Sequence, residues 1–188
     1  MYGTSEIRKG LRIEMEGEVY TIVDFLHVKP GKGGAFIRTK LKSMSRGTVI
    51  DKTFRSGEKL GRPDLEEKKM QFLYKSDQQY CFMDTETYEQ TFLNPEQLGS
   101  SKDFLKENTT ISVLFHNNNP LAVELPTFVV LAIAETEPGE KGDTVSGGTK
   151  PATLETGAVV RVPLFVQTGE MIKVDTRTGA YVSRAKEG

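Results

Sequence analysis

The chain has 188 residues, with 25 Lys and Arg against 26 Asp and Glu, so its formal net charge is −1 when both histidines are neutral. Hydrophobic residues make up 37% of it, and no apolar run approaches the ~20 residues of a membrane-spanning helix, which excludes a helical transmembrane protein. A single cysteine excludes an internal disulfide, and two histidines far apart in the sequence argue against a Cys- or His-based metal site.

The first twelve residues carry Lys and Arg, but no apolar segment follows them, so the sequence shows no secretory signal. We therefore expect a cytoplasmic protein that does not associate with membranes.

Charge is distributed unevenly along the chain. Residues 1–64 hold 13 Lys and Arg against 8 Asp and Glu, residues 65–126 hold 5 against 10, and residues 127–188 hold 7 against 8. Turn signals at 61–63 and at Pro126 fall at the same boundaries. We predict three domains, 1–64, 65–126 and 127–188, each within the size range that folds alone.

Eighteen glycines, eight prolines and many short β-branched or aromatic runs predict an all-β protein. In the first third, residues 18–29 and 35–42 form the plainest hairpin, joined by a Gly- and Pro-rich loop at 30–34. Alternation along its second arm gives one face that packs and one that is cationic. The packed face carries Ala35, Ile37, Thr39 and Leu41, and the cationic face carries Phe36, Arg38, Lys40 and Lys42.

The other two thirds each contain about five short strand-like runs. In the middle third these cover residues 69–76, 79–84, 88–93, 110–116 and 121–125, and in the last third 128–135, 153–156, 158–162, 171–175 and 180–184. In the middle third, between the runs 88–93 and 110–116, Asn94-Pro95-Glu96 predicts one brief helix, because Asn can cap it and Pro is preorganised at its first position. Five short strands in about 60 residues fit a barrel of the oligonucleotide-binding (OB) type, although the pattern alone also fits an SH3-like barrel.

The loop between the two arms of the hairpin is the most distinctive segment. Lys32 stands between Gly31 and Gly33, so it projects into solvent or into a partner. One interpretation is a flexible turn with a solvated charge, and the other is a loop that enters a narrow cavity or is handled by a modifying enzyme. The spacing fits neither a Walker A nor a dinucleotide-binding motif.

Signatures of catalysis are missing from the sequence, which has no G-x-S-x-G and no H-E-x-x-H motif. Asp84 and Glu86 are interpreted as a turn at a strand end, His116 as part of a polar turn, and Cys81 as a small buried hydrophobe. His27 fits a phosphate contact or a plain surface position. In the last third, Arg161, Lys173, Arg177, Tyr181 and Arg184 fit phosphate binding and base stacking, or simply a solvated barrel face.

Two motifs and a third segment resemble bacterial translation elongation factor P over essentially the whole chain. The first is Lys29-Pro30-Gly31-Lys32-Gly33 with Ala35-Phe36, which is similar to the family's modified-lysine loop. The second is the C-terminal signature, which spans residues 150–157, 162–165 and 169–184. The segment 82–88 is also typical of the family.

The resemblance implies an L-shaped mimic of transfer RNA, built from a KOW-like (SH3-like) barrel followed by two OB barrels. Such a factor binds the ribosome between the peptidyl and exit sites when synthesis stalls on consecutive prolines, and it assists ribosomal RNA without being an enzyme. Lys32 would reach toward the peptidyl-transferase centre, lengthened in many members by β-lysylation or another modification. No cofactor and no metal are implied.

The resemblance also implies partners and contact residues. The partners are ribosomal RNA and proteins, the peptidyl-tRNA and an enzyme that modifies Lys32, and the factor would act as a monomer. The loop residues are Lys29, Pro30, Gly31, Gly33 and Gly34, and the RNA-contacting residues are His27, Arg38, Lys40, Lys42, Gly142, Asp143, Thr144, Arg177, Tyr181 and Arg184. The Gly-Asp-Thr set would approach the exit-site codon. The alternative is a paralogous OB-fold RNA-binding protein with a different RNA target.

Overall fold

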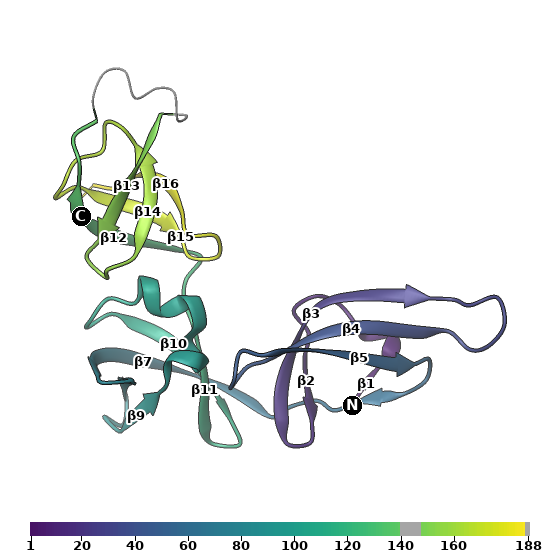
Figure 1. Cartoon of the computed structure of the whole chain (residues 1–188). Coiled ribbons are helices and arrows are strands. Elements are labelled where there is room, and N and C mark those ends of the chain that lie inside the picture. The colour runs from purple at the N-terminus through teal and green to yellow at the C-terminus, as the bar shows by residue number, and fades with distance from the viewer. Residues whose placement is uncertain (140–147, 187–188) are drawn as a thin grey trace.

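Three β-units lie in an L, with the middle unit at the corner and the first and third units as its two arms (Figure 1). This is the arrangement in a computed structural model, which describes residues 1–139 and 148–186. Among these residues the regular structure is almost entirely strand, and the single α-helix is one short turn. The expected all-β class with three small barrels in an L is confirmed.

The first barrel is a four-stranded antiparallel sheet in the order β2-β3-β4-β5, accompanied by a ribbon of β1 and β6. Its elements are β1 (Tyr2–Gly3), η1 (Thr4–Glu6), β2 (Arg12–Met15), β3 (Glu18–Val28), β4 (Phe36–Ser43), β5 (Val49–Arg55) and β6 (Lys59–Leu60). Ile13, Ile22 and Leu41 are completely buried in its core. Strand β3 runs past the end of β2, so its outer half pairs only with β4.

The middle barrel has the strand order β11-β10-β7-β8-β9, and β9 contacts β11 to close it. Its elements are β7 (Leu65–Ser76), β8 (Gln79–Asp84), β9 (Gln90–Leu93), α1 (Pro95–Leu98), η2 (Gly99–Phe104), β10 (Thr110–His116) and β11 (Asn119–Glu124). Helix α1 begins as predicted, because the Asn94 side chain accepts a hydrogen bond from the Gln97 amide and Pro95 takes the first helical position. It ends at Leu98, where Gly99 adopts a positive φ of 56°.

The third barrel repeats this topology in the order β14-β13-β12-β15-β16, with β14 against β16. Its strands are β12 (Phe128–Thr136), β13 (Thr149–Leu154), β14 (Val159–Pro163), β15 (Met171–Asp175) and β16 (Ala180–Arg184). In both barrels the first strand pairs with the second and the fourth, which is the OB arrangement. Phe104 from η2 packs into the core of this barrel and joins it to the middle one.

The first and middle barrels meet at a separate small apolar cluster. Val19 of β3 is buried there with Leu114, Leu121 and Ala122 of β10 and β11. Because these residues come from two different sheets, the junction has a core of its own rather than a bare linker.

Four strands of the first barrel were not predicted: β1 and β6, which have two residues each, and β2 and β5. Strand β2 has only four residues. Strand β5 has seven, but only Phe54 among them is buried, so the alternation that marks a half-buried strand is absent. In the other barrels, β7 begins at Leu65 and β13 at Thr149, each four residues before the predicted start. The described residues contain no helix that is long and apolar enough to cross a membrane.

Candidate RNA-binding hairpin

The hairpin of β3 and β4 carries its loop to the end of the first arm that lies farthest from the middle barrel (Figure 1). Val28 pairs with Phe36 as the last matched residues, and residues 29–35 form the loop beyond them. Gly33 has a φ of 110°, which an L side chain rarely adopts. Lys32 is exposed, and open space surrounds the glycines on both sides of it. The tip is therefore a narrow backbone loop in which Lys32 stands between two glycines, with Lys29, also exposed, at the base of the loop.

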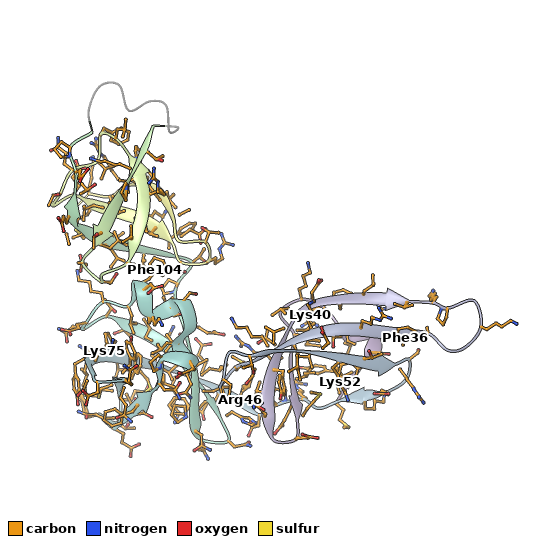
Figure 2. All side chains as sticks on the ribbon, in the orientation of Figure 1. Phe36, Lys40, Arg46, Lys52, Lys75 and Phe104 are labelled. Carbon is orange, nitrogen blue, oxygen red and sulfur yellow. The ribbon has the colours of Figure 1, made fainter. Side chains whose placement is uncertain are left out.

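Strand β4 has the two faces that the alternation predicts. Ile37, Thr39 and Leu41 are buried, whereas Arg38, Lys40 and Lys42 are exposed on the opposite face. The Arg38 guanidinium lies 5.7 Å from the centroid of the Phe36 ring, which orients it beside the hairpin. Figure 2 shows Phe36 near the loop and Lys40 closer to the middle barrel.

The three cations of this face are not equivalent. Lys40 lies between Asp24 and Asp51 on the neighbouring strands, and its Nζ is 3.9 Å from Asp51 Oδ1. This pair is largely exposed, so it holds Lys40 only weakly. Among the described residues, no ion pair involves Arg38 or Lys42. Arg38 and Lys42 are therefore the two cations of β4 that have no acidic partner among the described residues.

His27 does not share the cationic face. It pairs with Ile37, and residues directly opposite each other across two strands point to the same side of the sheet. Its ring contacts Phe25 edge to face, with centroids 5.6 Å apart. The structure thus separates His27 from Arg38, Lys40 and Lys42, although all four are predicted RNA contacts.

The predicted contact residues of the third barrel are occupied by internal contacts. Arg177 donates to Asp175 from Nη2 at 2.9 Å and from its own amide at 2.8 Å, and these hydrogen bonds lower the pKa of Asp175. Arg184 donates to the carbonyl oxygen of Phe165 at 2.9 Å and lies over that ring at 4.3 Å. Tyr181 is half-buried and packs against the barrel core, so it is not the exposed stacking ring that the sequence suggested.

Gly142, Asp143 and Thr144 lie outside the described residues. The interpretation of Asp84 and Glu86 as a strand-end turn is confirmed, since Asp84 Oδ1 accepts hydrogen bonds from the Glu86 and Thr87 amides, which lower its pKa. Cys81 is completely buried, as expected. The described residues contain no cluster of three His, Cys, Asp or Glu side chains suited to a metal ion.

His116 makes a contact between barrels that its place in a polar turn does not predict. Its Nε2 lies 3.2 Å from Oε1 of Glu14 in the first barrel, and a second pair between the same two barrels joins Arg12 to Glu124. No local pattern marks these partners, because they are more than 100 positions apart. The composition hinted only that the first third is basic and the middle third acidic.

One barrel with a protruding lysine hairpin, followed by two OB-type barrels, is the architecture of a multi-barrel translation factor. Family models match the three units in turn: an elongation factor P KOW-like domain over residues 3–60, an elongation factor P OB domain over residues 65–123, and an elongation factor P C-terminal domain over residues 129–184. The chain belongs to the elongation factor P family and is a translation elongation factor.

Curated relatives agree with this assignment, and a solved structure shares the fold. Elongation factor P of Natranaerobius thermophilus is 58% identical over 99% of both chains. That of Moorella thermoacetica is 55% identical over 98% of this chain and 100% of its own. A translation initiation factor 5A from Methanococcus jannaschii shares the fold at a TM-score of 0.53 and 21% identity, over 65% of this chain and 92% of that one.

Proposed function

We propose that this factor binds the ribosome between the peptidyl and exit sites and stimulates peptide-bond formation at consecutive prolines. In this proposal Lys32 extends toward the peptidyl-transferase centre. The observation that carries it is the geometry of the hairpin tip, where an exposed lysine stands on a narrow glycine loop at the far end of one arm of the L (Figure 1). Such a tip can enter a passage that a whole barrel cannot.

The physical reason for assistance lies in proline itself. Its ring fixes φ and removes the amide hydrogen, so a prolyl donor and a prolyl acceptor are hard to align. Holding the peptidyl-tRNA in a reactive geometry lowers the entropic part of the barrier. Lys32 would act as a positioning cation and hydrogen-bond donor, and ribosomal RNA would supply the catalysis. A lysine-modifying enzyme that lengthens Lys32 would extend its reach.

The remaining contacts follow from charge. Arg38 and Lys42 would bind RNA phosphates, an attraction that is independent of sequence and weakened by salt. The acidic middle domain would face ribosomal protein or solvent. The functional units would be residues 1–64, 65–126 and 127–188, and the factor would work as a monomer in the cytoplasm.

Reconstituted translation of a reporter with three consecutive prolines, compared with a proline-free reporter, tests this proposal. The protein is taken from its native host and its intact mass is recorded. We expect a proline-specific acceleration that Lys32→Ala abolishes and that Lys59→Ala leaves unchanged, since Lys59 is an exposed lysine of the same barrel away from the tip. An excess mass that disappears in the Lys32→Ala protein would identify a modification there.

A proline effect that survives Lys32→Ala would overturn the role of the tip. RNA or ribosome binding by the mass-verified protein without any proline-specific effect would favour the paralogue with a different RNA target.

A further inference from the structure

We propose that Lys150 is a positioning residue, which holds the connection between β12 and β13 in the direction that the third barrel needs for its contact with the ribosomal complex. This inference rests on the proposed function for the ribosome as the partner. We call residues 137–139 and 148–150 the stem of this connection. The stem lies at the end of the third barrel that is farthest from the middle barrel (Figure 1).

The length of the connection is not required by the fold. The middle and third barrels share one topology, so the β7–β8 and β12–β13 pairs are equivalent. Residues 77–78 are enough to join β7 to β8, whereas residues 137–148 join β12 to β13. Connections of about a dozen residues in a compact domain usually serve a function. The longer one is therefore a contact element that the third barrel has and the middle barrel lacks.

The side chain of Lys150 points into the third barrel instead of into solvent. Lys150 pairs with Val162 across β13 and β14, and Val162 is completely buried, so both side chains lie on the inner face. Only 7% of Lys150 is exposed. Its ammonium donates a hydrogen bond to the carbonyl oxygen of Glu137, the residue that follows β12. One side chain thus ties the two sides of the stem together from inside the barrel.

Stability does not explain an ammonium at this position. Taking the charge out of water costs free energy even where it finds partners, and an apolar side chain of similar volume is often at least as stable. Ala152 and Leu154, which follow Lys150 on the inner face of β13, are apolar and buried. The lysine is better explained by the backbone that it holds.

A second set of contacts holds the stem at Leu164, in the connection from β14 to β15. A Cβ added to Gly139 would overlap the carbonyl oxygen of Leu164, so the two segments pass in direct contact. The Leu164 amide donates to the carbonyl oxygen of Gly148 at 3.3 Å. Both sides of the stem therefore meet at Leu164, while Lys150 joins them from within.

The first test measures the stem by itself. Lys150→Met keeps the length of the side chain and removes its donor, and Lys186→Met makes the same change at an exposed lysine of the same chain segment. We expect the Leu164 amide to exchange its hydrogen about tenfold faster in Lys150→Met and at the wild-type rate in Lys186→Met. The midpoint of urea unfolding should be at least as high as in the wild type. Unchanged exchange, or a lower midpoint, would contradict a positioning role.

The second test measures binding to ribosomes that carry peptidyl-tRNA. We expect Lys150→Met to weaken binding about tenfold and Lys186→Met to leave it unchanged. In the proline reporter, the factor concentration for half-maximal acceleration should rise by the same factor, whereas the maximal acceleration stays within about twofold, because Lys32 is intact. A lower maximal acceleration with unchanged binding would overturn the proposal. Gly139→Ala disturbs the stem from the Leu164 side and should reproduce the loss of binding.

A chain in which a Gly-Ser sequence of equal length replaces residues 140–147 separates positioning from packing. This chain should bind ribosomes as weakly as Lys150→Met, and Lys150→Met should add no further loss to it, because the stem then has nothing to position. A further loss, or wild-type binding by the Gly-Ser chain, would overturn the proposal.

The outcomes also separate this inference from the proposed function. Ribosome binding that depends on Lys150 without any proline-specific acceleration would contradict the proposed function alone. Ribosome binding and proline-specific acceleration that are both unchanged in Lys150→Met would contradict this inference alone.

Discussion

The Nε2 atom of His116 lies 3.2 Å from Oε1 of Glu14, and this contact joins the middle barrel to the first at the junction between the two arms. Arg12 forms an ion pair with Glu124, again between the two barrels. Together with the apolar cluster around Val19, these pairs resist rotation of one barrel against the other. The direction in which the first arm points, and with it the position of Lys32, depends on this junction.

Breaking the Arg12–Glu124 pair should loosen the angle between the barrels without unfolding either of them. Both side chains are about one-third exposed, so we expect Glu124→Ala to cost only ~0.5–1 kcal/mol in the free energy of unfolding. Small-angle X-ray scattering should nevertheless show a broader range of shapes. The charge swap Arg12→Glu/Glu124→Arg should restore the wild-type curve. Lys69→Ala, which removes a pair inside the middle barrel, is the control. An unchanged scattering curve for Glu124→Ala would refute the role of the pair.

Glu18 should make the first barrel sensitive to acid. Burial alone would raise its pKa, but hydrogen bonds from Ser43, Arg46, Tyr20 and Ser45 outweigh burial and lower the pKa from 4.5 to about 2. A pKa that is lower in the folded state stabilises the fold above the unfolded value, and this contribution is lost as the pH falls from about 4.5 toward 2.

We therefore expect Glu18→Gln to destabilise the protein by ~1 kcal/mol at pH 7, discounted for the partial exposure of the pair, and by progressively less below pH 4.5. Urea unfolding at pH 7, 4 and 2.5 measures this difference. Glu58→Gln changes an exposed carboxylate of the same barrel and should show no such trend. A Glu18→Gln effect that is the same at all three pH values would contradict the assignment.

The sequence predicted what short-range physics determines. The alternation along 35–42 identified the buried and cationic faces of β4, and Asn94-Pro95 identified the start of α1, because each depends on neighbouring residues alone. Strand β5 was not predicted, because Phe54 is its only buried residue and the strand shows no alternation of buried and exposed side chains. The sequence could not predict the contact between His116 and Glu14, because two residues 102 positions apart meet only once the two barrels have docked.

Among the contact residues, the sequence identified charge but not its surroundings. Lys40 and Arg177 have the expected charge, yet each has an acidic neighbour, Asp51 in one case and Asp175 in the other. Half-buried Tyr181 shows the same limit, because the exposure of an aromatic ring depends on the strands that happen to close over it.

Phe104 should matter for the junction between the middle and third barrels. It extends from η2 into the core of the third barrel, where it belongs to the same buried cluster as Leu131, Val160 and Val174. Truncation to alanine leaves a cavity, so we expect Phe104→Ala to cost ~3 kcal/mol in the free energy of unfolding. Phe128→Ala is the matched control, because that ring is 44% exposed. Chemical unfolding followed by the NMR amide signals of the third barrel compares the two. Equal losses would show that Phe104 is not part of this core.

Gly61 should tolerate no side chain, because the backbone of Glu14 passes directly over it. The Glu14 amide donates to the carbonyl oxygen of Gly61 at 3.0 Å, and a Cβ added at Gly61 would overlap the carbonyl oxygen of Glu14. Gly61→Ala must push these two segments apart, at a cost of ~1–3 kcal/mol. Gly34→Ala is the control, since nothing lies within 4 Å of the position and it needs no positive φ. Amide hydrogen exchange at Glu14 should accelerate in Gly61→Ala and stay at the wild-type rate in Gly34→Ala. Because Glu14 is also the partner of His116, Gly61→Ala should in addition loosen the junction between the first and middle barrels. Unchanged protection of the Glu14 amide in Gly61→Ala would contradict the close approach of the two segments.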